Sequence, residues 1–244
     1  IREVRPTFLT AVPRIFEKIH AKILDTVSSM TGVKKKLAEW SISVGLQTVP
    51  YRQRSQKLPF MLGFKYSIAD KLVLNKFRAA LGGKVRACSS GGSALSKEVG
   101  SFFCGIGISI IEGYGLTETS PVMTIGHPDL FKFGTVGKAI PGVEVKIQPD
   151  GEIVCRGHNV MMGYYKNEEA TNEAIIDGWF HSGDIGEFDE DGLLRITDRK
   201  KSLIVTSGGK NVAPQPMEVS LTSNKYIEQC NIVGDDRNFI SALI

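Results

Sequence analysis

Cysteine is scarce in this sequence, and its spacing fits neither a redox motif nor a metal motif. Four cysteines lie far apart in apolar stretches and form no C-x-x-C pair: Cys88, Cys104, Cys155 and Cys230. We therefore expect buried free thiols in a reducing compartment, with no disulfides and no cysteine-based metal centre. The four histidines show no ligand spacing either.

A long hydrophobic run is missing as well. The most apolar stretch, residues 99–111, is too short to span a bilayer and contains three glycines. No signal peptide is visible. These observations predict a cytoplasmic protein and leave peripheral membrane contact open.

The sequence has little excess of charge of either sign. Its 244 residues include 30 Lys+Arg and 26 Asp+Glu, a net charge of +4, which is too mild to indicate a nucleic-acid partner. The three consecutive lysines at 34–36 are interpreted as a solvated helix face, and a membrane-surface or anionic-ligand patch is the alternative.

The common nucleotide-binding loops are absent. Gly-Lys pairs occur at 83–84, 137–138 and 209–210, but none has the surrounding residues of a P-loop. The G-x-G runs at 105–107 and 113–115 lack the third glycine of the dinucleotide fingerprint. A nucleotide site in this chain would have to be built in another way.

Hydrophobic periodicity predicts helices in the first part of the chain. Residues 13–29 form an amphipathic helix in which Ile15, Ile19, Ile23 and Val27 share a face. Residues 33–47 are predicted to be helical, and residues 49–63 are interpreted as a loop or an insertion.

A strand–helix–strand unit follows. A helix at 67–81 stops at two glycines, a strand covers 84–90, a helix begins after Ser96 as its N-cap, and a second strand covers 107–111. This order predicts a βαβ unit in a parallel sheet. The loops after its two strands should lie where open α/β sheets bind ligands.

Antiparallel structure is predicted from 134 to 197. Alternating apolar residues flank turns at Asp150–Gly151 and Asp191–Gly192, which indicates two hairpins. The acids of the second turn could suggest a calcium loop, but their spacing does not match an EF-hand. A strand, a glycine turn, a helix from Pro216 and two further strands complete the chain.

Several polar clusters could bind a nucleotide. The glycine-rich loop 89–94 offers backbone that a flat ring can approach closely. Tyr114 offers an aromatic face and Glu118 a carboxylate, while Arg199 has a fixed charge suited to phosphate or ribose oxygens. Asp184 follows a glycine and could hold paired ribose hydroxyls. Taken singly, each has a plain alternative as a turn, core or surface residue.

Taken in order, these clusters resemble a known family. "YGLTE", "GEIVCRGHNVMMGYY", "GWFHSGDIG" and "DGLLRITDRKKSLIVTSGGKNVAPQPME" follow one another as in the acyl-adenylate-forming (AMP-binding) superfamily. Other stretches, such as "RPTFLTAVPRIFEKIHAKI", are similar to its long-chain fatty acid–CoA ligases. The resemblance covers nearly the whole chain.

The resemblance implies an α/β fold and a domain organisation. Residues 1–197 would be the latter part of the large AMP-binding domain, with a parallel βαβ sheet and an antiparallel β subdomain. Residues 198–203 would be the hinge, and 204–244 the start of a small α+β domain. The family's triphosphate loop and its C-terminal lysine have no counterpart here, so we expect a partial chain that is incomplete for turnover.

The resemblance also implies roles for individual residues. Tyr114 would stack on adenine, Glu118 would ligate Mg²⁺, Asp184 would accept hydrogen bonds from the ribose and Arg199 would contact the ribose or a phosphate. Lys201 would be the hinge pivot. The remaining positions would contact the adenine, the α-phosphate or the path of the CoA thiol: Gly91, Gly92, Ser93, Gly115, Thr117, Gly208 and Gly209.

The expected function is ATP-dependent activation of a long-chain fatty acid to acyl-AMP, followed by thioester formation with CoA. ATP or AMP, Mg²⁺ and CoA are the expected cofactors, and the fatty acid, ATP and CoA are the expected partners. Two alternatives remain open: a ligase for another carboxylic acid, and a non-catalytic nucleotide-binding relic. The intact motif residues argue against the relic, and no oligomeric state follows from the patterns.

Overall fold

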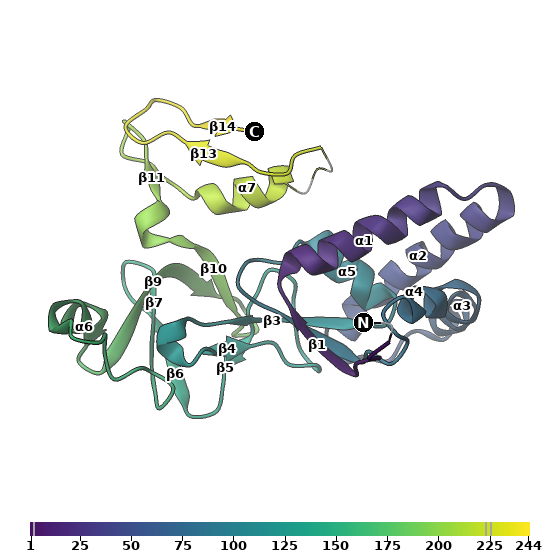
Figure 1. Cartoon of the computed structure of the whole chain (residues 1–244), viewed down its shortest axis with the longest axis horizontal. Helices are drawn as coiled ribbons and strands as arrows, with labels where there is room; N and C mark the ends of the chain where they lie inside the picture. Colours follow the sequence, from purple (N-terminus) through teal and green to yellow (C-terminus); the bar gives the residue numbers. More distant parts are fainter. Residues whose placement is uncertain (2, 223, 225) are drawn as a thin grey trace. The chain divides into compact units, whose positions relative to one another are not determined.

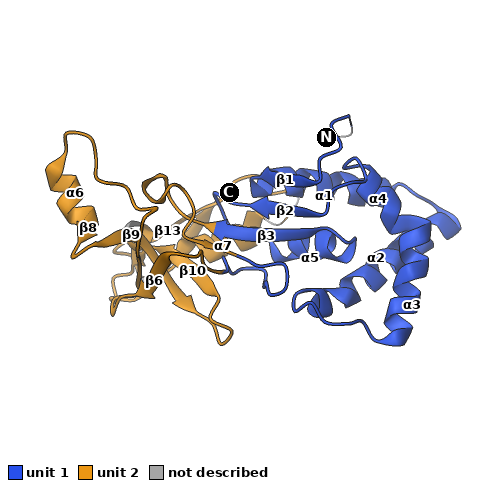
Figure 2. Cartoon of the chain, turned by 90° about the horizontal axis from the view of Figure 1, so that it is seen from below, with its two compact units in different colours: residues 1–113, 126–137 blue, residues 114–125, 138–244 orange. Residues whose placement is uncertain are grey.

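The chain folds into two compact units, and neither is one continuous stretch of sequence. The computed structural model describes residues 1, 3–222, 224 and 226–244. The first unit comprises residues 1–113 and 126–137, and the second comprises 114–125 and 138–244 (Figure 2). The chain thus leaves the first unit, returns to it, and leaves it again.

A parallel sheet forms the centre of the first unit. Strands β1 (Phe8–Ala11), β2 (Ala87–Ser90) and β3 (Ser109–Tyr114) lie side by side in that order (Figure 2). Helix α5 (Lys97–Gly105) joins β2 to β3, which confirms the predicted βαβ unit. Ser96 precedes α5 as expected, but its side chain makes no capping hydrogen bond.

The other helices of the first unit follow one another along the chain (Figure 1). They are α1 (Pro13–Ser28), α2 (Gly32–Arg52), α3 (Phe60–Ala69), a π-helical turn η1 (Asp70–Leu74) and α4 (Asn75–Ala79). The interpretation of 49–63 as a loop is wrong at both ends, because α2 continues past Pro50 and α3 begins at Phe60. Pro59 directly precedes α3, a position where proline does not disturb a helix.

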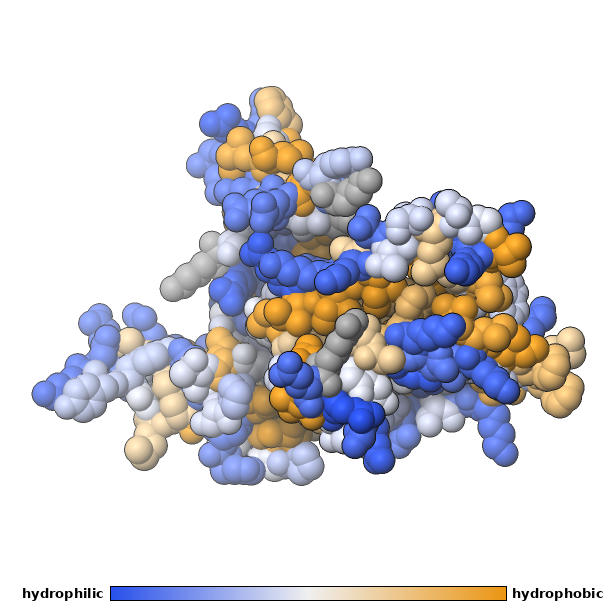
Figure 3. Space-filling view, turned by 45° about the vertical axis from the view of Figure 1, so that its right-hand side comes forward, coloured by the Kyte–Doolittle hydropathy of each residue, from blue (hydrophilic) through white to orange (hydrophobic). Residues whose placement is uncertain are grey.

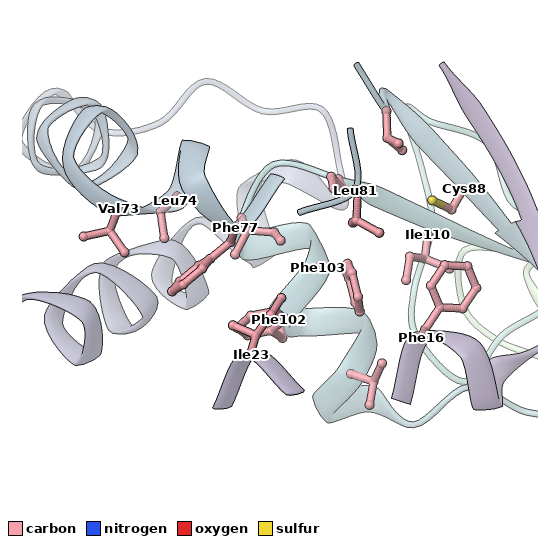
Figure 4. Close-up of a cluster of buried hydrophobic side chains, with 14 of the residues drawn as sticks. Phe16, Ile23, Val73, Leu74, Phe77, Leu81, Cys88, Phe102, Phe103 and Ile110 are labelled. Carbon is pink, nitrogen blue, oxygen red and sulfur yellow. The ribbon is translucent and has the colours of Figure 1, made fainter. Parts of the chain in front are cut away.

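Aromatic side chains from two helices fill the core of the first unit. Phe16 of α1 meets Phe103 of α5 edge to face, with ring centroids 5.7 Å apart, near Ile110 and Cys88 of the sheet (Figure 4). The buried face of α1 is Phe16, His20, Ile23 and Val27. The apolar face predicted for this helix began one residue too early, at Ile15, which is exposed.

Antiparallel strands dominate the second unit. Their order is β10-β9-β7-β6, and β8 also pairs with β9. These strands are β6 (Val143–Ile147), β7 (Glu152–Gly157), β8 (Ile175–Ile176), β9 (Trp179–Phe188) and β10 (Leu194–Arg199). Both predicted hairpins are therefore confirmed. Helix α6 (Glu168–Ala174), the short helix η2 (Thr117–Thr119) and the pair β4 (Thr124–Ile125) and β5 (Lys138–Ala139) complete this part.

The described residues from Lys200 to the end of the second unit form small paired elements. A 3₁₀ turn, η3 (Lys200–Ser202), leads from β10 to the hairpin β11 (Ile204–Val205) and β12 (Asn211–Val212). Helix α7 (Pro214–Thr222) begins two residues before the predicted start. Strands β13 (Asn231–Val233) and β14 (Ser241–Leu243) then pair antiparallel, as expected.

The surface carries apolar as well as charged side chains. Both kinds are visible on the face drawn in Figure 3. Three cysteines are buried as predicted, whereas Cys230 is only half-buried. The described helices include none with the length and hydropathy needed to cross a bilayer.

Candidate functional site

A short loop after β3 presents the first candidate residues. Its centre is Thr119, which is fully buried, accepts a hydrogen bond from the Leu116 N–H at 2.9 Å and lies 3.0 Å from the Pro121 carbonyl oxygen. The Asn159 side-chain amide donates to the carbonyl of Thr119 at 3.0 Å. Thr119 therefore holds the loop together, while Thr117 is exposed.

Gly115 has a steric reason to be glycine. A Cβ added there would collide with the carbonyl oxygen of Pro121, on the far side of the same loop. A side chain at 115 would push this turn open and displace the residues that follow it.

Three of the predicted nucleotide-contacting residues meet at one carboxylate. The hydroxyl of Tyr114 donates to Oδ2 of Asp184 at 2.6 Å, and Nε of Arg199 lies 3.3 Å from Oδ1. Neighbouring strands set this arrangement, because Arg199 on β10 is directly opposite Asp184 on β9. The Asp184 carboxylate is buried, whereas the Arg199 side chain is 72% exposed.

The electrostatics of this cluster hold Tyr114 in its protonated form. Burial raises the pKa of Tyr114 far above its usual value, and the hydrogen bond to Asp184 raises this pKa further. Tyr114 therefore stays a hydrogen-bond donor, and its ring packs against the apolar cluster of Met123, Val143, Cys155 and Phe180.

Glu118 has a partner that the sequence did not identify. The Tyr164 hydroxyl donates to Oε1 of Glu118 at 3.0 Å, and the Met161 N–H donates to the Glu118 carbonyl at 2.8 Å. The other carboxylate oxygen of Glu118 accepts no hydrogen bond within the described part of the chain. Tyr164 lies in "MMGYY", a stretch that carried the family resemblance without a role for any one residue.

Glu112 is a second carboxylate that the sequence did not single out. It is buried in β3, and it accepts hydrogen bonds from the Leu95 N–H at 3.1 Å and the Gly134 N–H at 3.0 Å. Burial raises the pKa of Glu112, and the two N–H groups oppose that change. The carboxylate thereby fixes the far end of the glycine-rich loop.

The glycine-rich loop itself belongs to the first unit. Gly91, Gly92 and Ser93 follow β2, and Gly92 has φ +87°, a conformation that favours glycine. Gly92 and Ser93 are exposed, and a Cβ on Gly91 would only touch the Gly113 carbonyl. This backbone is open to a flat ligand. Tyr114, Glu118, Asp184 and Arg199 belong to the second unit.

The remaining predicted residues lie after β10. Lys201 is in η3, and Gly208 and Gly209 form the β11–β12 turn, in which the Gly209 N–H donates to the Thr206 carbonyl at 2.8 Å. None of the backbone hydrogen bonds of the described residues joins this turn to Tyr114 or Asp184.

These groups are suited to a nucleotide and a magnesium ion. The described residues contain no cluster of three or more His, Cys, Asp or Glu side chains that could hold a metal by themselves. Mg²⁺ commonly binds through one or two carboxylates together with phosphate oxygens and water. Glu118, with one carboxylate oxygen uncommitted, fits such a site.

Family models match both parts of the chain. The model described as "AMP-binding enzyme" covers residues 1–165, and the model described as "AMP-binding enzyme C-terminal domain" covers residues 201–244. The chain is 44% identical over 243 residues to a long-chain-fatty-acid–CoA ligase, FadD15, of Mycobacterium bovis. It is 39% identical to the long-chain-fatty-acid–CoA ligase ACSBG2 of Xenopus laevis.

The chain spans only part of these relatives. The match to FadD15 covers 98% of this chain but 40% of FadD15. The match to ACSBG2 covers 100% of this chain but 34% of ACSBG2.

Two solved structures of CoA ligases also match this chain over part of their length. O-succinylbenzoate coenzyme A synthetase of Bacillus subtilis, in complex with ATP and a magnesium ion, is 29% identical with a TM-score of 0.60; the match covers 65% of this chain and 36% of the other. The anthranilate CoA ligase AuaEII has the same fold over 99% of this chain and 39% of its own, with a TM-score of 0.64 at 19% identity.

Proposed function

Because the chain belongs to the AMP-binding enzyme family, we propose that it is the nucleotide-binding part of a long-chain fatty acid–CoA ligase. In two steps, such an enzyme would transfer AMP from ATP to a fatty acid with release of pyrophosphate, and then pass the acyl group to the thiol of CoA with release of AMP. The convergence of Tyr114 and Arg199 on the buried Asp184, in a chain similar to such ligases, carries the proposal.

Each residue has a specific task in this proposal. Tyr114 presents its ring to adenine, and Asp184 accepts hydrogen bonds from the ribose hydroxyls. Arg199, with its guanidinium largely exposed, binds ribose or phosphate oxygens. Thr117, which is exposed, donates its hydroxyl to the α-phosphate. Glu118 holds Mg²⁺, which when bound would neutralise charge on the phosphates.

The glycine loops bind the rest of the substrates. Gly91, Gly92 and Ser93 present open backbone to the adenine ring, with Gly115 in the loop that follows Tyr114. Gly208 and Gly209, whose turn leaves room around both Cα atoms, lie along the path of the CoA thiol. We propose residues 1–197 and 204–244 as parts of two domains, with 198–203 as the hinge segment and Lys201 as its pivot.

The proposed order of steps follows from the chemistry of carboxylates. A carboxylate is a poor electrophile because oxide must leave, whereas the AMP group of acyl-AMP is a good leaving group. Fixed donors such as Arg199 can stabilise the negative charge that develops in the first step.

Pyrophosphate release tests this proposal directly. The protein that carries this chain is incubated with ATP, Mg²⁺ and a panel of acids from short to long chains, with o-succinylbenzoate and anthranilate included. We expect the greatest release with long-chain fatty acids, and acyl-CoA by mass spectrometry when CoA is added. Greatest release with an aryl acid would instead favour a ligase for that acid, and no release with any acid would contradict the proposal.

A matched pair of variants assigns the metal site. Glu118→Gln should lower Mg²⁺-dependent pyrophosphate release by at least tenfold, because a neutral amide is a weaker ligand for Mg²⁺. Glu187→Gln removes an exposed carboxylate that faces Arg195 elsewhere in the second unit and should have no effect. Equal activity of both variants would show that Glu118 is not a ligand of Mg²⁺.

A further inference from the structure

A second polar cluster lies in the second unit, centred on Glu152. This carboxylate is buried at the start of β7; its Oε1 accepts the Gly183 N–H at 2.9 Å. Its Oε2 lies 3.0 Å from Nδ1 of His181 and 3.1 Å from Nζ of Lys200. One carboxylate thus connects the "HSGD" stretch of β9 with η3.

Lys200 has a second acidic partner. Its Nζ donates to Oδ2 of Asp150 at 2.7 Å, and the other oxygen of Asp150 accepts the Glu152 N–H at 3.1 Å. The Lys200 and Asp150 side chains are each about half exposed, at 47% and 51%. The ammonium of Lys200 therefore sits between one buried and one solvated carboxylate.

The charged groups of this cluster stabilise one another in their ionised forms. Burial alone would raise the pKa of Glu152. Hydrogen bonds from His181, Lys200 and the Gly183 N–H, together with the charge of Lys200, outweigh burial and lower this pKa. Asp150 and Glu152 raise the pKa of Lys200. At neutral pH both acids are negative and Lys200 is positive, so the ion pairs are at full strength.

Solvent reaches the cluster. An open hollow of about 540 Å³ adjoins it, lined by Glu173 and Ile176 as well as by the charged residues already named. An ion pair beside water is weaker and more easily broken than a fully buried one. This cluster can therefore hold a segment and still release it.

We propose that Lys200, through Asp150 and Glu152, is a latch that fastens the hinge segment 198–203 to the β6–β7 turn. The consequence for catalysis rests on the proposed function, in which one site performs two reactions in turn. With the latch closed, η3 keeps the conformation seen here. With the latch open, the hinge segment is free to change its backbone angles. Lys200 is thus a positioning residue, distinct from the proposed pivot Lys201.

Limited trypsin digestion tests the latch without any substrate. Trypsin cuts after Arg199, Lys200 and Lys201, and Asp150→Asn leaves all three sites in place. An exposed ion pair contributes a few tenths to 1 kcal/mol, so we expect cleavage within 199–201 to become about two- to fivefold faster. Glu144→Gln is the matched control, because it breaks the exposed Glu144–Arg156 pair of the same β6–β7 hairpin and should leave that cleavage unchanged. Equal rates for wild type and Asp150→Asn would overturn the latch.

A double-mutant comparison links the latch to turnover. The ratio of CoA thioester formation from supplied acyl-adenylate to pyrophosphate release is measured for Lys200→Met, Asp150→Asn and the double variant. We expect a change of about threefold in this ratio for Lys200→Met, and no further change when Asp150→Asn is added, because Asp150 acts through Lys200. An unchanged ratio, or two independent effects, would contradict the latch.

Pyrophosphate release and trypsin digestion together distinguish failure of the proposed function from failure of the latch. If no acid supports pyrophosphate release and Asp150→Asn is still cleaved faster, the proposed function is wrong and the latch stands. If the enzyme is active and cleavage is unchanged, the latch is wrong and the proposed function stands.

Discussion

Asp184 links the three side chains that meet in the candidate site. It is buried at 5% exposure, and its carboxylate accepts a hydrogen bond from the Tyr114 hydroxyl and pairs with the Arg199 guanidinium. A buried carboxylate without such partners would be costly. The same two oxygens are therefore both the structural link between two strands and the proposed acceptors for a ribose.

Substitution of Asp184 tests that double role. Asp184→Ala should weaken ATP binding, because each lost hydrogen bond to a charged group costs on the order of 1.5–3 kcal/mol. The loss should be smaller for 2′,3′-dideoxy-ATP, which has no ribose hydroxyls to donate. Calorimetric titration with both nucleotides measures the difference.

Tyr114→Phe is the control for the Asp184 experiment. It removes the hydroxyl but keeps the carboxylate, so it should affect the two nucleotides equally. Equal weakening of ATP and dideoxy-ATP by Asp184→Ala would exclude the ribose contact.

Asp198 gives a prediction of pH dependence at the scale of one residue. It is 2% exposed, its Oδ1 accepts the Arg199 N–H, and among the described residues its Oδ2 finds no hydrogen-bond partner. Burial raises the pKa of Asp198, which the Arg199 N–H opposes, and the charge of Glu218 adds to the increase. The charged form is therefore disfavoured in the folded state.

The raised pKa means that ionisation of Asp198 lowers the stability of the folded protein. Because the folded-state pKa lies above the unfolded value of about 3.9, Asp198 destabilises the protein progressively as the pH rises through that range. Asp198→Asn removes this ionisation, so it should raise the unfolding free energy more at pH 7 than at pH 4. Urea denaturation at both pH values measures it, and a gain that is independent of pH would contradict it.

At the level of helices, a close glycine contact fixes how α2 and α5 cross. A Cβ on Gly45 would lie 2.7 Å from the Gly105 carbonyl oxygen, and a Cβ on Gly105 would lie 2.9 Å from the Gly45 carbonyl carbon. The two backbones touch there, so neither position has room for a side chain.

Two matched glycine substitutions test this contact. Gly45→Ala should destabilise the protein by about 1–3 kcal/mol, because overpacking forces the helices apart. Gly63→Ala, in α3, has its nearest neighbour at 3.9 Å and should stabilise by about 0.5–1 kcal/mol through helix propensity. Thermal unfolding of the two variants measures both changes, and equal shifts would show that the crossing tolerates a methyl group.

The same elements show what the sequence could predict. The βαβ unit and the hairpins were predictable, because strand periodicity and turn glycines are local signals. The end of α2 and the start of α3 were not, because Val49 and Phe60 stand next to prolines whose effect depends on their place in the helix. The buried face of α1 was off by one residue, because Phe16 and Ile15 are both apolar and tertiary packing chooses between them.

The candidate site was predictable to a similar extent. Tyr114, Asp184 and Arg199 were identified through the family resemblance, and their distances came from strand pairing that no local pattern encodes. Tyr164 and the Glu152 cluster were missed, because their partners lie 46 and 48 residues away in sequence.

For the whole molecule, the main feature is the way the chain alternates between its units. Residues 114–125 belong to the second unit although the next twelve residues return to the first. Met123, from this short stretch, is completely buried against Val143, Cys155 and Phe180. The second unit therefore builds part of its core from this early segment.

A pair of fragments tests this dependence. Residues 114–244 should unfold cooperatively, whereas residues 138–244 should not, because loss of a buried methionine alone costs about 2–5 kcal/mol. Each fragment contains a single tryptophan, Trp179, so fluorescence against urea concentration reports on the same position in both. A transition at the same urea concentration in the two fragments would show that residues 114–125 are dispensable.

The four cysteines differ in burial, and this difference allows one of them to be labelled selectively. Burial raises the pKa of Cys88, Cys104 and Cys155 to about 11, so the reactive thiolate is rare at neutral pH. Cys230 is only half-buried and lies beyond η3, in the part of the chain that follows the proposed hinge segment. A maleimide dye on the wild-type protein should therefore attach there first. The sequence thus supplies its own attachment point for a fluorescent probe of the proposed hinge motion.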